Sequence, residues 1–338
     1  MKRPNIIFLV SCLVIGAVTL AVVGGIVLTN VAMGLRSPEE GRRWPKDIKG
    51  CLLEIGGDGT IRVHSSRGVN YHTLPHYVHD GYWAGFSERL GAAIMVDRTS
   101  ERLYSVTLDA NQQVVARRLP HDWVFDWGWS LTDEILYKIV GSGDQVRLIQ
   151  RNLLTRKEVI QNIHWLPEGV HCKSEWESVP SVSKDGSITY DVHSPDGDSV
   201  ILYARKLSET PQVLASGDNP HWMQQSTTIA YAPEGNTAND ISLVYTDILR
   251  GTENKISLWR ATGLWKLTSI MPFPQDRPWF ITRIDSASPH HLICQVQRYK
   301  YPDNWFYVVD LKDGGVVQLP VQTGDCLWFP ADTARDGR

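Results

Sequence analysis

The chain has 338 residues, of which 21% are charged and 42% hydrophobic, and its formal net charge is -3 at neutral pH. This composition is typical of a folded protein and excludes a largely disordered chain. The sequence has no clustered basic excess, so nucleic acid is not an expected partner.

The amino-terminal segment predicts a membrane anchor. Residues 6–35 contain no charged side chain, and Lys2 and Arg3 precede them. A helix of about 20 apolar residues spans a bilayer, whereas the apolar region of a secretory signal has roughly 7–15. We therefore predict an uncleaved signal-anchor helix within residues 1–35. Cleavage after the small-residue site Ala32-Met33-Gly34 is the alternative.

Small residues follow one another at intervals of four along this segment, at Ala17, Ala21 and Gly25. Such a stripe lets two helices approach closely, which predicts a homodimer through the anchor. The alternative is that Ala and Gly are simply common in spanning helices.

The rest of the chain divides into three parts. Residues 36–49 form a predicted polar tether, residues 50–330 a predicted all-β domain, and residues 331–338 a predicted disordered tail. In the all-β part, short runs rich in Val, Ile, Tyr and Leu alternate with turn sequences such as Asp58-Gly59 and Asp185-Gly186.

A pattern of two strands recurs five times between residues 80 and 320. The first strand of each unit is a short apolar run: Ile94-Met95-Val96, Ile135-Leu136-Tyr137, Ile188-Thr189-Tyr190, Ile229-Ala230-Tyr231 and Leu292-Ile293-Cys294. The second carries a large residue followed by Leu: Tyr104 and Leu108, Ile149 and Leu153, Tyr203 and Leu207, Tyr245 and Leu249, Tyr307 and Leu311. The first four apolar runs are 41, 53 and 41 residues apart. This spacing is typical of the four-stranded blades of a propeller.

Turn sequences precede several of the apolar runs, namely Trp129-Ser130-Leu131-Thr132-Asp133-Glu134, Ser183-Lys184-Asp185-Gly186-Ser187, Pro220-His221-Trp222 and Ser288-Pro289-His290-His291. They resemble the TolB-like, WD40-like propeller repeat, whose core is a Trp-Ser-Pro-Asp-Gly turn. The resemblance implies a β-propeller, and the five units together with the two chain ends favour six blades. Seven blades are the alternative, because residues 250–280 are long and irregular.

The sixth blade is predicted to combine the two ends of the domain. The run from Asp325 to Pro330 has no blade after it, and the run from Cys51 to Ile55 has no inner strand before it. Pairing the two would close the ring and cover its open edges. This placement predicts a Cys51–Cys326 disulfide, with two buried free thiols as the alternative.

Candidate site residues are few. His72, His76 and His79 could bind a transition metal together with Asp80, or belong to a polar loop between blades. Asp80, Asp126 and Asp285 are placed by the repeat to line the channel or to lie on solvated blade edges.

Trp83, Trp127 and Trp222 recur near the predicted inner strands. They could fill the gaps between blades, or line the channel mouth and contact a partner. The sequence has no Gly-x-Ser-x-Gly elbow and no phosphate-binding loop, so we expect no catalytic residue and no cofactor.

The resemblance implies a periplasmic protein of the bacterial inner membrane that acts as a protein-binding scaffold or envelope-complex subunit. A cluster of positive residues after the anchor favours the opposite orientation, with the propeller in the cytoplasm, since positive residues favour the cytoplasmic side of a membrane. This cluster consists of Arg36, Arg42, Arg43, Lys46 and Lys49. Two other classes stay open: an enzyme acting on a sugar or lactone in the channel, and a sensor of a small ligand.

Overall fold

The computed structural model describes residues 44, 48–56, 58–73, 80–109, 111, 113–121, 123–142, 145–163, 166–167, 170, 176–193, 198–223, 226–236, 240–260, 279–298, 304–322 and 325–330. None of these residues belongs to a helix long and apolar enough to cross a membrane. The predicted anchor, with Ala17, Ala21 and Gly25, lies outside the described residues, as does the predicted tail.

The described secondary structure consists of β-strands, and they build six blades. Blade 1 consists of β4 (Gly81–Ser87), β5 (Ala92–Asp97), β6 (Arg102–Leu108) and β7 (Val114–Arg118). Blade 2 consists of β8 (Ser130–Thr132), β9 (Ile135–Ser142), β10 (Gln145–Asn152) and β11 (Glu158–Ile163). Strand β12 (Trp176–Ser178) joins the sheet of blade 2. Blade 3 begins with β13 (Ser181–Val182), β14 (Ile188–His193) and β15 (Ser199–Ala204).

Blades 3 and 4 share the long strand β16 (Gln212–Trp222). Blade 4 continues with β17 (Thr228–Pro233), β18 (Asp240–Asp247) and β19 (Thr252–Arg260). Blade 5 consists of β20 (Trp279–Ser288), β21 (His291–Arg298), β22 (Asn304–Asp310) and β23 (Val316–Gln322). Blade 6 consists of β24 (Asp325–Pro330), β1 (Gly50–Ile55), β2 (Thr60–Ser65) and β3 (Gly68–Thr73).

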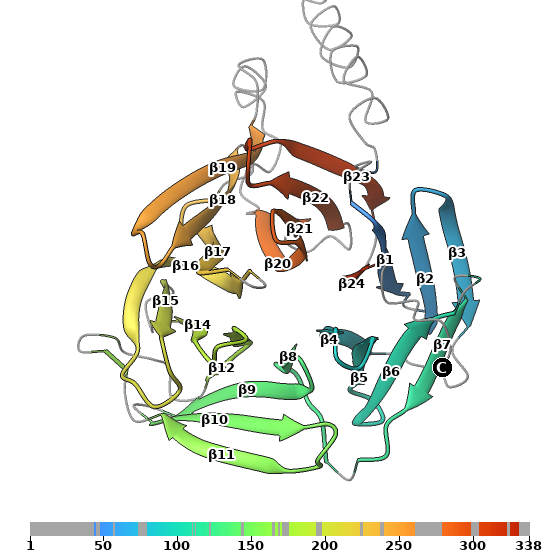
Figure 1. The fold of residues 1–338 in the computed structure, drawn as a ribbon, viewed down its shortest axis with the longest axis horizontal. Coiled ribbons are helices and arrows are strands. Elements are labelled where there is room, and N and C mark those ends of the chain that lie inside the picture. The colour runs from blue at the N-terminus through green and yellow to red at the C-terminus, as the bar shows by residue number, and fades with distance from the viewer. Residues whose placement is uncertain are drawn as a thin grey trace, which may run out of the picture.

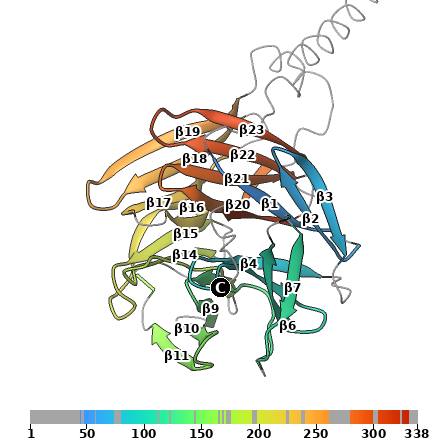
Figure 2. The ribbon, with the colours of Figure 1, turned by 45° about the vertical axis from the view of Figure 1, so that its right-hand side comes forward.

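The blades stand around a common axis. Figure 1 looks down this axis and shows β4, β8, β20 and β24 toward the centre, with β3, β7, β11, β19 and β23 at the rim. Figure 2, turned by 45°, shows that the blades are twisted sheets. The recurring apolar runs are the second strands of their blades and the Tyr/Ile-to-Leu runs begin on the third, as the propeller interpretation predicts.

Antiparallel pairing within each blade defines two faces of the ring. The first-to-second and third-to-fourth hairpins lie on one face, which we call the hairpin face. The second-to-third hairpins and the crossovers from an outer strand to the next inner strand lie on the other, which we call the crossover face. Residues just before an inner strand, such as Asp80 and Trp127, therefore lie toward the crossover face.

The core lies between the blades. Six clusters of buried hydrophobic side chains each join two neighbouring blades, and together they run right around the ring. A blade is apolar on both faces and buries them only against its neighbours, so stability belongs to the closed ring.

The ring closes through blade 6, as the sequence predicts. Strand β24 pairs with β1 in antiparallel register from Gly50↔Pro330 to Ile55↔Asp325. The carboxyl-terminal end of the domain thus supplies the inner strand, and the amino-terminal end supplies the other three.

The predicted Cys51–Cys326 disulfide is wrong. Cys51 lies opposite Phe329, and Cys326 lies opposite Glu54. The register offset is three residues, so the two thiols point to opposite faces of the sheet. Cys51 packs between blades 6 and 1, and Cys326 packs between blades 5 and 6. Both are buried free thiols, and burial raises the pKa of Cys51 to about 12.

Part of the predicted polar tether packs on the ring. Trp44 and the buried Ile48 join the hydrophobic cluster between blades 5 and 6, where the Trp44 and Trp328 ring centroids are 5.9 Å apart. The chain is therefore held against the propeller before β1 begins.

The sheets of blades 2 and 3 each depart from the regular four-stranded repeat. Strand β12 pairs with β9 of blade 2 and extends the inner edge that β8 begins. Strand β16 pairs with β15 up to Ser216 and with β17 from Gly217, so one strand serves as the outer edge of blade 3 and the inner edge of blade 4. Gly217 (φ 154°) allows the change of partner, because a Cβ there would lie 2.3 Å from the Ala232 carbonyl oxygen.

Candidate functional site

A cavity of about 790 Å³ lies between the inner strands at the centre of the ring. Its walls include Trp127 and His193 toward the crossover face, and Glu88 and Lys184 at hairpins of the opposite face. An ion pair of 2.8 Å between Lys184 and Glu88 joins blades 3 and 1 at that end. The cavity has the volume of a small-molecule site.

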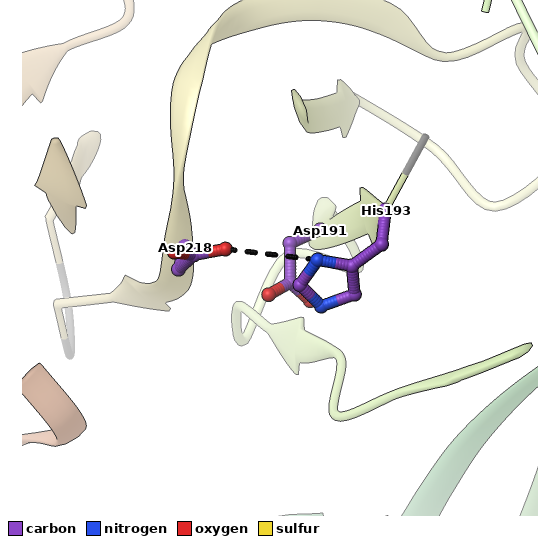
Figure 3. A group of neighbouring side chains, drawn as sticks. All are labelled: Asp191, His193 and Asp218. Atoms are coloured by element: carbon purple, nitrogen blue, oxygen red, sulfur yellow. Dashed lines mark ion pairs between the residues drawn. The ribbon is translucent and has the colours of Figure 1, made fainter. Parts of the chain in front are cut away.

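Three polar residues of the cavity wall converge near the crossover face: Asp191, His193 and Asp218. Asp191 and His193 are two residues apart on β14, so their side chains project from the same side of the strand. Asp218 follows Gly217 at the point where β16 passes from blade 3 to blade 4. Figure 3 shows the three side chains close together, with the Asp218 carboxylate directed toward the imidazole.

The three side chains each offer one ligand atom within 4.8 Å of the others. Nδ1 of His193 lies 4.0 Å from Oδ1 of Asp218, the pair marked in Figure 3. The side chains of His193 and Asp218 are 49% and 39% exposed, so they remain accessible to a ligand from solvent.

Neighbouring groups hold these side chains in place. Ser178 donates a hydrogen bond of 2.6 Å from its hydroxyl to Oδ1 of Asp191, and the backbone N–H of Asn219 donates one of 3.3 Å to Oδ2. The Ser199 hydroxyl contacts both Nδ1 of His193 and the Asp218 carboxylate. Such supporting contacts fix the orientation of a binding group before a ligand arrives.

Negative charge is concentrated here. Burial raises the pKa of the Asp218 carboxyl above its usual range, and the charge of Asp191 raises it further, against the opposing effects of Ser199 and His193. Oδ1 of Asp218 is buried and accepts no hydrogen bond from the described residues.

The arrangement is not that of a hydrolase triad. In a Ser-His-Asp triad the hydroxyl and the carboxylate contact opposite nitrogens of the imidazole. Here Ser199 and Asp218 both approach Nδ1 of His193, and Ser199 is only 8% exposed.

A second polar group ties blades 4, 5, 6 and 1 together around the cavity. Arg283 bonds Asp285 at 2.9 Å and donates a hydrogen bond of 2.8 Å to the Trp83 carbonyl. The Trp83 amide donates to Asp325 at 3.3 Å, and His221 shares a bond of 3.1 Å with Ser286. Burial lowers the pKa of His221 to about 4. These contacts brace the inner strands, and Arg283 and Asp285 neutralise each other.

Asp80 and Asp126 do not line the cavity. Asp126 pairs at 2.7 Å with the buried ammonium of Lys138 and accepts a hydrogen bond from the Trp129 indole. Burial would raise the pKa of Asp126, but these partners outweigh it and hold the pKa below its usual value. Asp80 pairs with Arg98. Both carboxylates therefore serve as counter-ions of nearby cations.

The three candidate tryptophans divide into two kinds. Trp83 and Trp222 are 2% and 6% exposed and pack between blades, so they are core residues. Trp127 is 52% exposed, and all three tryptophans border the cavity. Of the predicted histidine site, His72 lies on β3, the outer strand of blade 6, while His76 and His79 lie outside the described residues.

Sequence reasoning missed Asp191, His193 and Asp218. The available signal was the Asp-x-His spacing at the end of a repeat strand, since alternate residues share one face. The partner Asp218 carried no local signal, because its position depends on the path of β16.

No protein-family model matches the sequence, and no curated protein does. Solved structures do match. TolB from Acinetobacter baumannii is 12% identical with a TM-score of 0.53, over 85% of this chain and 68% of that one. A putative TolB from Agrobacterium tumefaciens is 9% identical with a TM-score of 0.49, over 84% of this chain and 100% of that one. The similarity to TolB from Acinetobacter baumannii shows that the chain has a TolB-like β-propeller fold.

Proposed function

We propose that the protein is a membrane-tethered propeller of the bacterial envelope that binds a protein partner through its crossover face. The uncharged stretch of residues 6–35 supports an inner-membrane anchor. The TolB-like resemblance supports a periplasmic propeller that serves as a scaffold or complex subunit.

The observation that carries this proposal is the exposure of Trp127. The other described tryptophans near inner strands are buried between blades, with Trp83, Trp129, Trp222 and Trp328 exposed by 6% or less. Trp127 is 52% exposed, so its surface is not explained by folding. Exposed aromatic residues are characteristic anchors of protein interfaces.

Trp127 is also held in position before a partner binds. The Tyr82 ring lies 4.7 Å from it, and the Arg98 guanidinium lies 5.3 Å from its ring centroid. Asp80 pairs with Arg98 and fixes that side chain in turn. Val124, 59% exposed in the same crossover segment, adds apolar surface. We define Val124, Trp127 and Arg98 as the crossover patch. A protein segment that places an apolar side chain against Trp127 would fit it.

A second candidate function is the binding of a small ligand in the channel, which the cavity of about 790 Å³ favours. This sensor role needs no partner protein. It depends on the interior of the ring, whereas the scaffold role depends on the crossover patch and the anchor.

Crosslinking in intact cells, followed by purification of the full-length protein from membranes, tests the proposal. A stoichiometric envelope protein should copurify, and replacing residues 1–35 by a cleavable signal should abolish this. Trp127→Ala should weaken binding of the purified partner by at least about 2 kcal/mol, or about thirty-fold, as for an interface anchor. Leu249→Ala, which removes a 66% exposed apolar side chain at the β18–β19 hairpin of the opposite face, is the control. Equal losses in both variants would contradict the assignment of the patch.

A further inference from the structure

We propose that Asp191, His193 and Asp218 form a binding site for one divalent transition-metal ion, of the Mn²⁺ or Zn²⁺ class, inside the propeller channel. The site lies on β14 and β16 in blades 3 and 4, apart from Trp127, which precedes blade 2. The proposal thus goes beyond partner binding and does not depend on it.

The spacing of the donor atoms suits a single ion. One ligand atom of each side chain lies within 4.8 Å of the other two. Metal–ligand distances in proteins are about 2.0–2.6 Å, so two ligands on opposite sides of one ion are separated by roughly 4–5 Å. An ion between the three groups would need only small side-chain movements.

The donors are supported from behind, as metal ligands usually are. Hydrogen bonds from the Ser178 hydroxyl and the backbone N–H of Asn219 fix the orientation of the Asp191 carboxylate. The Ser199 hydroxyl contacts both His193 and Asp218. These contacts come from β12, β15 and β16, so the site is built on strands. Strands hold a ligand set more rigidly than a loop does.

The charge at the site calls for a cation. Among the described residues, neither Asp191 nor Asp218 forms an ion pair with a lysine or arginine, and the two carboxylates repel each other. Oδ1 of Asp218 is buried and accepts no hydrogen bond within the described part of the chain, which is unfavourable for a carboxylate oxygen. A divalent ion would supply both the missing positive charge and a partner for this oxygen.

The donor types select the metal. Two carboxylates alone would suit Ca²⁺ or Mg²⁺, whereas an imidazole favours transition metals. Three protein ligands leave coordination positions open, and His193 and Asp218 are partly exposed in the cavity wall. Water or an anionic channel ligand could occupy these positions.

Isothermal titration of the full-length, chelator-stripped protein in detergent with Mn²⁺ and with Zn²⁺ tests the proposal. We expect one ion per chain, and a loss of affinity of at least tenfold in Asp191→Asn, Asp218→Asn and His193→Gln. Asp109→Asn, at the β6–β7 hairpin of blade 1, makes the same change of charge elsewhere and should bind like the wild type. Thermal unfolding of each metal-free variant checks folding. Asp218→Asn removes the repulsion between the Asp218 and Asp191 carboxylates, so the metal-free variant should be at least as stable as the wild type.

Three results would overturn the site. One is the absence of Mn²⁺ and Zn²⁺ binding to the stripped protein. Another is binding that survives all three substitutions. The third is tighter binding of Ca²⁺ or Mg²⁺ than of Mn²⁺ and Zn²⁺ with no effect of His193→Gln, because the imidazole would then not be a ligand.

Discussion

His221 is half-buried where blade 4 meets blade 5. Burial lowers its pKa to about 4, against the opposing charge of Asp285 and with the help of Arg283. Between pH 6.5 and 4 the unfolded chain therefore binds a proton at this residue that the folded chain does not. Protonation of the unfolded chain therefore favours unfolding in this pH window, so the free energy of unfolding falls as the pH falls.

We expect His221→Gln to remove about 3 kcal/mol of this pH dependence, because the amide can still bond Ser286 but does not titrate. Urea unfolding at several pH values between 4 and 7 measures the effect. His290→Gln, in the exposed turn before β21, is the matched substitution control. A slope equal to that of the wild type in His221→Gln would mean that this imidazole titrates normally.

Residue roles were the least predictable feature. The repeat predicts that Asp126 and Asp80 line the channel or lie on blade edges, but it does not predict their partners Lys138 and Arg98, which come from β9 and the β5–β6 hairpin. Cys51 and Cys326 lie on paired strands, and only the register shows that their side chains face apart. A repeat pattern places a residue along the ring but does not show what it touches.

At the scale of the strand, β16 is the most unusual element. Its two halves belong to different blades, and the register shifts between Asp218 and His221. Gly217 lies at the change of partner, and this geometry brings the following residue, Asp218, close to Asp191 and His193 of β14.

Gly217→Ala should destabilise the protein severely, because the new methyl group would lie 2.3 Å from the Ala232 carbonyl oxygen of β17, a backbone atom that cannot move alone. Gly235→Ala is the control, since it also has a positive φ (83°) but open space around its Cβ. Its expected effect is the strain alone, about 1–2 kcal/mol. Thermal unfolding compares the two, and similar losses would contradict the close approach.

Strand positions were largely predictable, because turn residues and apolar runs are local signals. The second strand of each of the five units lies where the sequence places it. The exceptions are β12, which pairs with β9 of blade 2, and β16, which pairs with strands of blades 3 and 4. No local signal in the sequence specifies such a choice of partner.

At the scale of the whole molecule, closure through blade 6 distinguishes a ring from an open array. Side chains of β24 contribute to two of the six interblade clusters, Leu327 and Phe329 to one and Cys326 and Trp328 to the other. The contacts of the last strand thus connect blades 5, 6 and 1.

Truncation after residue 322 should abolish cooperative unfolding, because two interblade cores lose buried residues and β1 becomes an exposed edge. Truncation after residue 330 removes only the predicted tail and should leave the transition unchanged. Near-ultraviolet circular dichroism during heating compares the two. A cooperative transition in the shorter chain would show that the ring does not depend on its closing strand.

The ring and its closure could be predicted because incomplete blades at the two chain ends complement each other. The cavity could not be predicted, because its wall contains residues from all six blades, as far apart in the sequence as Tyr82 and Pro330. Convergence of this kind depends on three-dimensional packing that no single segment specifies.

Site-specific photocrosslinking in living cells tests the central claim, that the crossover patch binds a protein. A photoreactive residue at Val124, which is 59% exposed and three residues before Trp127, should give one discrete crosslinked protein, and the added substitution Trp127→Ala should abolish it. The same residue at Val213, 53% exposed on β16, should give none. Equal crosslinking from both positions, or none from Val124, would contradict the account.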